Sequence, residues 1–377
     1  MFSMVYELGK LPLKSLLGPV ADATALWARL DERIARSPIG PGWIERLHFS
    51  DACASLWIDG ELVHLEDLVL HDAEHDIRTP THELTMARDV LKTRRRIALQ
   101  PAGWALKAEN IRNLQGLETS APTPPQSDRA EDSQEALQPD AADDGEAPDP
   151  GDPLAAELAA IDALLIRSEA AIAEARAPDR RDRRDRDPLV YDLDWDEDER
   201  IAEWQSVLRE TEGLPPLLRA VLCLDAWNSL EVLQHMNWLG RLLAAAILRQ
   251  AGITTAGHLA AINYGLKAIP VDRRRHRDRN IRLLSLLEGI SAGAAQGLKD
   301  HDRLLLARQV MERKLIDRRT SSRLPQLIDL VIARPLVSAS MVASTLDVTP
   351  QAARRIVAEL GLREMTGRGR FRAWGVL

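Results

Sequence analysis

The stretch ARPLVSASMVASTLDVTPQAARRIVAELGLREMTGRGRFRAWGVL, residues 333–377, decides the fold of the C-terminal part of this chain. Ser338 is placed to cap a short helix. The apolar residues of that helix are Met341, Val342, Ala343 and Leu346. The segment Asp347-Val348-Thr349 then interrupts the helical pattern. Asp347 stands at a turn position that usually carries glycine, and aspartate tolerates a left-handed backbone better than most residues.

A second helix is predicted directly after this turn. Thr349 followed by Pro350 is a strong helix start, because the hydroxyl accepts a free N–H and proline fits the first turn. Gly361 ends the helix as a left-handed cap. The residues at helical spacing that form its apolar face are Ala353, Ile356, Val357 and Leu360.

The other face of this second helix is polar or small. It carries Gln351, Ala352, Arg354, Arg355 and Ala358. The alanines allow a close approach, and the glutamine and arginines supply donors for base edges and phosphates. Residues 362–376 then form two short runs around a glycine-arginine turn, which predicts a hairpin with a cationic tip. Together these patterns predict a winged helix-turn-helix.

The charge of this segment favours double-stranded DNA as the partner. Residues 334–377 hold seven arginines against three acids, a formal charge of +4. We expect the helix Pro350–Leu360 to enter the major groove and the arginines of the wing to meet the backbone or the minor groove. The residues assigned to this interface are Thr349, Gln351, Ala352, Arg354, Arg355, Arg368, Arg370 and Arg372. The alternative is a winged helix that binds protein, with solvated arginines.

The overall charge of −8 is misleading as an average. Residues 118–152 hold eleven acids and a single basic residue, Arg129, so this stretch carries the acidity and the remainder is slightly positive. The stretch also has hardly any aliphatic residues, which predicts a disordered linker. The predicted parts are an N-terminal helical domain (1–115), the acidic linker (116–152), a helical core domain (153–322) and the winged helix-turn-helix (323–377).

The body ahead of the winged segment is predicted to be all-α, so the fold class is mainly α. No strand pattern precedes residue 336. The densest apolar stretch, Leu214 to Ile269, is the predicted hydrophobic centre. Two further helices are expected near 280–289 and 301–317.

Cysteine usage and hydropathy indicate a cytoplasmic protein without a membrane span. Cys53 and Cys223 each lie in a helical apolar pattern and are expected to be buried, reduced thiols. The N-terminus has no secretory pattern, and no apolar run reaches the length of a membrane-spanning helix.

Two polar clusters are candidates for chemistry. Three His-Asp dipeptides occur, at His71, His75 and His301. His71 and His75 are four residues apart, which places two imidazoles on one helix face. A metal site would need further ligands, so we interpret these as polar surface residues and predict no metal and no cofactor. The basic run at 273–277 is either an accessory phosphate-contacting loop, a loop held by the acidic linker, or solvated.

The chain resembles a bacterial family of uncharacterised proteins. The stretches that carry the likeness are HFSDACASLWIDGELVHLEDLVLHDAEHDIRTPTHELTMA (48–87) and the segment 334–377. Members combine a helical N-terminal domain, a domain of unknown function and a C-terminal helix-turn-helix DNA-binding domain. The resemblance implies a transcriptional regulator with no assigned activity.

The body is also similar to a degenerate Fic domain, a helical nucleotidyl-transferase fold. LPPLLRAVLCLDAW and WLGRLLAAAILRQAGI resemble its core helices. Active members carry H-P-F-x-D-G-N-G-R before G-R-L-L. In the register set by residues 240–243, Leu230 replaces the catalytic histidine, Gln234 the metal-binding acid and Trp238 the phosphate-binding arginine. The resemblance therefore implies a scaffold without catalytic residues.

Residues 55–60, SLWIDG, are close to the inhibitory S/T-x-x-x-E-G/N helix of the Fic family, with Asp59 in place of glutamate. This register leaves no arginine for Asp59 to occupy. The predicted function is sequence-specific DNA binding by a regulator, as a homodimer and without enzymatic activity. The alternatives are a divergent Fic-like transferase and a protein-interaction or antitoxin-like module.

Overall fold

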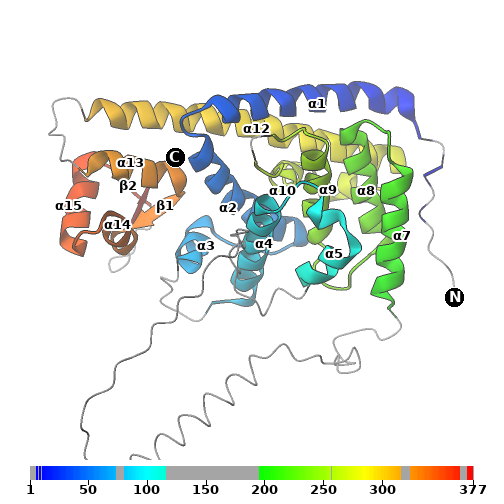
Figure 1. The fold of residues 1–377 in the computed structure, drawn as a ribbon, viewed down its shortest axis with the longest axis horizontal. Helices are drawn as coiled ribbons and strands as arrows, with labels where there is room; N and C mark the ends of the chain where they lie inside the picture. The colour runs from blue at the N-terminus through cyan, green and yellow to red at the C-terminus, as the bar shows by residue number, and fades with distance from the viewer. Residues whose placement is uncertain are drawn as a thin grey trace, which may run out of the picture. The chain divides into compact units, whose positions relative to one another are not determined.

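Helices account for all the regular structure that is described before residue 336 (Figure 1). The computed structural model describes residues 6, 8, 9, 11–73, 80–115, 195–255, 257–315, 323–365 and 372–376. The predicted acidic linker lies outside these residues. The helices of the body are α1 (Leu13–Arg36), α2 (Gly40–Asp59), α3 (Leu65–Asp72), α4 (His82–Leu99), the 3-10 helix η1 (Trp104–Leu106), α5 (Ala108–Gln115), α7 (Glu197–Glu210), α8 (Pro216–Leu230), α9 (Leu239–Gln250), α10 (Ile262–Leu266), α11 (Val271–Arg274) and α12 (Arg279–Arg313).

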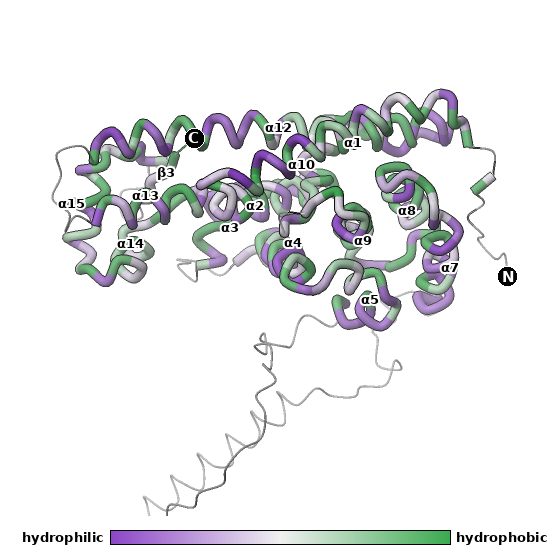
Figure 2. Tube along the Cα trace, turned by 45° about the horizontal axis from the view of Figure 1, so that its top comes forward, coloured by the Kyte–Doolittle hydropathy of each residue, from purple (hydrophilic) through white to green (hydrophobic). Residues whose placement is uncertain are grey.

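Helix α1, the first of the chain, and helix α12, the longest one described, pack side by side and run in the same direction (Figure 1). Ser15 Oγ donates to Asn280 Oδ1 at 2.9 Å near the start of both helices. Arg33 forms an ion pair with Asp302 at 2.7 Å further along both. Apolar and polar residues alternate along the two helices in Figure 2, as expected for helices with one buried face.

Helix α12 corrects one prediction, because the two helices expected near 280–289 and 301–317 are a single helix that continues to Arg313. The small residues between them do not break it. Gly293, Ala294 and Gly297 are instead buried where α12 meets its neighbours, and a Cβ on Gly297 would lie 2.8 Å from Leu30 Cδ2. Tertiary packing thus overrides the low helix propensity of glycine here.

The hydrophobic centre lies at α8 and α9, within the stretch predicted for it. Most residues of both helices are buried. Trp227 of α8 meets Trp204 of α7 edge to face, with ring centroids 5.4 Å apart, and the Trp204 indole donates to the Cys223 carbonyl at 2.9 Å. Both cysteines are free, as predicted. Cys223 is buried but Cys53 is only half-buried, and burial raises the pKa of the two thiols to about 11 and about 12.

A buried ion pair joins the N-terminal helices to the core. Arg94 of α4 and Asp51 of α2 are both fully buried, with Nη1 and Oδ2 2.6 Å apart. Arg94 Nη2 also donates to the Leu259 carbonyl at 2.6 Å. Asp51 accepts from Asn263 Nδ2 at 2.8 Å and from the Tyr264 amide at 2.9 Å. Residues 1–115 and 192–377 accordingly form one compact unit, so the two predicted parts of the body pack together.

The structure places two of the predicted surface histidines in the interior, so that interpretation was wrong for them. His71 is 6 % exposed and His301 is 3 % exposed. His301 Nε2 lies 2.8 Å from Ser37 Oγ, which satisfies the ring inside the packing of α1 and α12. His75 lies outside the described residues. Among those described, no group of histidine, cysteine or carboxylate side chains is arranged to hold a metal ion.

Candidate nucleic-acid interface

The C-terminal residues form three helices and a small sheet. The elements are α13 (Leu324–Ala333), β1 (Leu336–Ser338), α14 (Ala339–Leu346), α15 (Pro350–Leu360), β2 (Arg363–Glu364) and β3 (Ala373–Gly375). The strand order is β1-β3-β2 and both pairings are antiparallel. A helix pair followed by a hairpin, with one more strand from the preceding connection, is the predicted winged helix-turn-helix arrangement.

The turn between α14 and α15 has the predicted geometry. Ser338 caps α14, because its Oγ accepts from the Met341 amide at 3.2 Å. Asp347 has φ 51° and ψ 56°, the left-handed conformation expected for the position where glycine is usual. Thr349 then caps α15 through its Oγ1, which accepts from the Ala352 amide at 3.2 Å.

Helix α15 has one buried and one exposed face, as predicted. Ala353, Val357 and Leu360 are buried against the domain, and Gly361 ends the helix with φ 67°. These contacts fix the rotation of the helix about its axis. The side chains on the opposite face are therefore presented outward by the fold.

The outward face carries the residues assigned to DNA. Gln351, Arg354 and Arg355 are exposed, and Ala352 is half-buried beside them. Within the part of the chain that the structure describes, neither Arg354 nor Arg355 forms an ion pair with a carboxylate. Two adjacent guanidinium groups without an internal anion are suited to phosphate or to base edges.

The wing is described only at its base. Arg368 and Arg370 lie in residues 366–371, outside the described residues. Arg372 is described, and its Nη2 lies 2.6 Å from Glu364 Oε2 across the hairpin. This ion pair lowers the pKa of Glu364. Arg372 is thus held by β2, and its contact with DNA stays a prediction.

Sequence reasoning passed over Arg363, which is exposed on β2. The strand begins two residues after the Gly361 cap, so Arg363 is a further exposed cation of the domain, close in sequence to α15. It was counted in the charge of the segment but not assigned to the interface. The signal that would have found it is its place at the start of the first hairpin run, directly after the Gly361 cap.

The winged domain is attached to the body through arginine and lysine side chains that donate to backbone carbonyls. Arg46 of α2 donates to the carbonyls of Val331 at 3.0 Å, of Arg334 at 2.7 Å and of Val376 at 2.7 Å. Burial lowers the pKa of Arg46 to about 10, so it stays protonated at neutral pH. Lys314 Nζ donates to the last carbonyl of α15, that of Leu360, at 2.6 Å.

The structure also corrects the reasoning about Asp59. The sequence register left no arginine for this residue, but Arg241 of α9 reaches it. Arg241 Nη2 lies 2.6 Å from Asp59 Oδ2 and 3.0 Å from Ser55 Oγ, and Nη1 lies 3.0 Å from Asp59 Oδ1. The pair is bidentate, with the Arg241 side chain buried and the Asp59 side chain 27 % exposed. The likeness of the body to a Fic domain itself stays a prediction.

Comparison with known proteins finds a family match in each of two parts of the chain. Residues 189–316 match the family described as a protein of unknown function (DUF1612), and residues 324–377 match the family described as a helix-turn-helix DNA-binding domain. The uncharacterised protein y4cF of Sinorhizobium fredii is 62 % identical over an alignment of 383 positions, which covers 99 % of this chain and 100 % of that protein. The chain therefore belongs to the same family as this relative. It carries a DUF1612 domain followed by a C-terminal helix-turn-helix DNA-binding domain.

No helix among the described residues is long and apolar enough to cross a membrane. Over the described residues, this DUF1612 protein is mainly helical, and the few strands found there lie in the DNA-binding domain. The family match fixes the class of domain at the C-terminus.

Proposed function

We propose that this DUF1612 protein is a sequence-specific DNA-binding regulator of transcription that reads the major groove with α15. The observation that carries the proposal is the pair Arg354 and Arg355, exposed and without ion-pair partners among the described residues, on the outer face of the second helix of the motif. Gln351 extends the same face toward the helix start. A capped helix start that is also exposed suits a phosphate or base contact.

The neighbouring residues fill supporting roles. Thr349 caps the helix and places its first amides at the groove edge, while the small side chain of Ala352 lets the backbone come close. Arg363, Arg368, Arg370 and Arg372 are proposed to contact the backbone or the minor groove beside the helix. Contacts of this kind set position and affinity, and those of α15 set the sequence that is bound.

The test begins with the genome-wide binding sites of the intact protein, followed by gel shifts on fragments that contain them. Arg354→Ala with Arg355→Ala is expected to abolish the specific shift, since each base-contacting arginine contributes about 1–3 kcal/mol of discrimination. The matched control is Arg29→Ala with Arg36→Ala, which removes the same charge from the exposed face of α1. If the α15 variant keeps specific binding to the same extent as the α1 control variant, the assignment of Arg354 and Arg355 is refuted.

The wing is tested by its salt dependence. Arg368→Ala with Arg370→Ala is expected to weaken binding to all sequences alike and to reduce the slope of log K against log salt by about two, one for each lost phosphate contact. A change in sequence preference with an unchanged slope would contradict a backbone role and place these arginines at base edges.

We further propose that the protein binds as a homodimer, because two copies of one short helix read a longer, pseudo-palindromic site. Analytical ultracentrifugation with and without the selected fragment checks this. The prediction that the protein is not a nucleotidyl-transferase is checked by incubation with labelled nucleotides and a divalent metal ion. Labelled protein that appears in this mixture would favour the Fic-like alternative.

A further inference from the structure

A pocket of about 420 Å³ lies inside the body, away from the winged domain. Its wall is formed by the end of α2, the second half of α8, α9, α10, α11 and the start of α12. The charged and aromatic residues in the wall that matter here are Asp59, Trp227, Arg241, Arg274, Arg275 and Arg282. The pocket therefore brings together four arginines, one from α9, two at the end of α11 and one from the start of α12.

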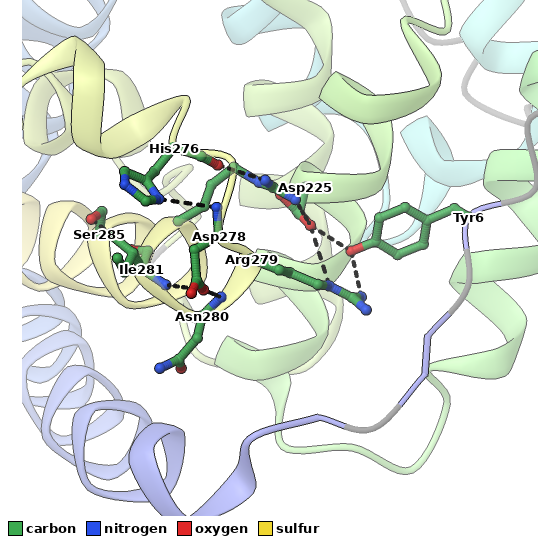
Figure 3. A network of polar contacts seen from close by, with 9 residues as sticks. Tyr6, Asp225, His276, Asp278, Arg279, Asn280, Ile281 and Ser285 are labelled. Carbon is green, nitrogen blue, oxygen red and sulfur yellow. Dashed lines mark hydrogen bonds and ion pairs between the residues drawn. The ribbon is translucent and has the colours of Figure 1, made fainter.

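Two of these arginines are neutralised by carboxylates. Arg241 is held by Asp59 in the bidentate pair described above. Arg282 is held by Asp225, which accepts from its Nη2 at 3.1 Å and from its Nε. Figure 3 shows Asp225 at the centre of this network, where the Tyr6 hydroxyl also donates to it at 2.7 Å. These two guanidinium groups need no further anion.

Arg274 has no such partner. It is only 8 % exposed, and its Nε donates to the Ile269 carbonyl at 2.9 Å. Its Nη2 is buried and makes no hydrogen bond within the described chain. Burial lowers the pKa of Arg274, and the positive charges of Arg241 and Arg275 lower it further. A buried guanidinium with an unpaired N–H is costly unless an anion completes it.

A second unsatisfied donor lies in the same wall. Trp227 is 1 % exposed, and its indole N–H has no acceptor among the described residues. Arg275, also in the wall, is exposed and forms no ion pair in the described part of the chain. The wall has one further acid, Glu231, which is exposed to solvent. The two buried groups of the wall that lack a hydrogen-bond partner among the described residues, Trp227 Nε1 and Arg274 Nη2, are both donors. Arg274 and Arg275 against Glu231 leave the wall with one positive charge that has no counter-charge in it.

We propose that this pocket binds a small molecule that carries a phosphate group, with the phosphate held by Arg274 and Arg275. A phosphate monoester offers three acceptor oxygens and nearly two negative charges, which match two adjacent guanidinium groups better than a single carboxylate does. The volume exceeds that of a phosphate ion, so the remainder holds the organic part against Trp227. The proposal does not depend on DNA binding.

The experiment is isothermal titration calorimetry of the full chain with inorganic phosphate, with phenyl phosphate and with benzoate, at constant ionic strength in chloride. We expect phenyl phosphate to bind more tightly than inorganic phosphate, and benzoate to bind weakest. Phosphate binding without any gain from the phenyl group would assign the site to the free ion. Absence of heat with both phosphates up to about 10 mM, a range that covers even weak sites, would overturn the proposal.

Variants separate ligand binding from folding. Arg275→Gln is expected to weaken phenyl phosphate binding about tenfold, the effect of losing one charge-assisted hydrogen bond. Its control is Arg277→Gln, an equally exposed arginine in the same segment that does not line the pocket. Arg274→Met is expected to abolish binding and to leave the protein folded, because it removes an unpaired buried charge. Equal affinity in wild type, Arg275→Gln and Arg277→Gln would refute the site.

Discussion

His258 gives the protein a pH-dependent stability whose size follows from its surroundings. The ring is fully buried beside Trp27 and meets Trp43 edge to face, with centroids 5.7 Å apart. Asp31 Oδ1 lies 3.6 Å from its Nδ1. Burial lowers the pKa of His258 to about 4, against the opposing effect of Asp31 and with a smaller lowering by Arg94.

The sign and the magnitude follow from proton linkage. The unfolded chain binds the proton near pH 6.5 and the folded chain only near pH 4, so stability falls as the pH falls below 6.5. The difference of 2.5 in pKa corresponds to about 3.4 kcal/mol once both states are protonated. At pH 5, where the unfolded state is protonated and the folded state is not, about 2 kcal/mol is already lost.

The assay is urea denaturation at pH 7.5 and pH 5.0 of the wild type and of His258→Leu, which cannot titrate. We expect the wild type to lose about 2 kcal/mol more than the variant between the two pH values. His48 is present in both proteins, and its pKa is lowered mainly by burial, then by Arg94 and Arg95 and least by His258. His64→Ala, at an exposed histidine, is the control. An equal loss in His258→Leu and wild type would refute the reasoning.

Three substitutions test the packing. Asp51→Ala is expected to destabilise the protein by about 3–5 kcal/mol in thermal or chemical unfolding, because it leaves Arg94 buried without an anion. Gly240→Ala is expected to cost about 1–3 kcal/mol in the same assays, since a Cβ would lie 2.2 Å from the Trp227 ring. Thr349→Ala is expected to remove about 1 kcal/mol of stability with the loss of the α15 cap, and a smaller change in hydrogen exchange at α15 than at the body would contradict that role.

The winged domain could be predicted from sequence because its signals are local. The caps Ser338 and Thr349, the left-handed Asp347 and the Gly361 stop each act within a few residues, and each has the predicted geometry. The apolar spacing of α15 then fixes which side chains face outward. The wing tip, with Arg368 and Arg370, stays a prediction.

The features that sequence reasoning missed depend on contacts between distant residues. Two apparent helices are one in α12, because its small residues are sites of close packing and not of chain reversal. The partner of Asp59 is Arg241, 182 positions away, and the pairing follows from the packing of α2 near α9. His301 is buried because Ser37 offers it a hydrogen bond across α1 and α12. No local pattern encodes these distances.

Arginine shows most clearly why a count of charges does not locate function. In the body, Arg94 and Arg241 are buried and form ion pairs with Asp51 and Asp59, so their charges are neutralised within the fold. On α15, Arg354 and Arg355 meet no carboxylate within the described residues, and in the pocket the same is true of Arg274. A cation that the fold leaves without an anion must find one in solvent or in a ligand. We therefore expect a polyanion at the exposed arginines of α15, and a small anionic ligand at the arginines that line the pocket.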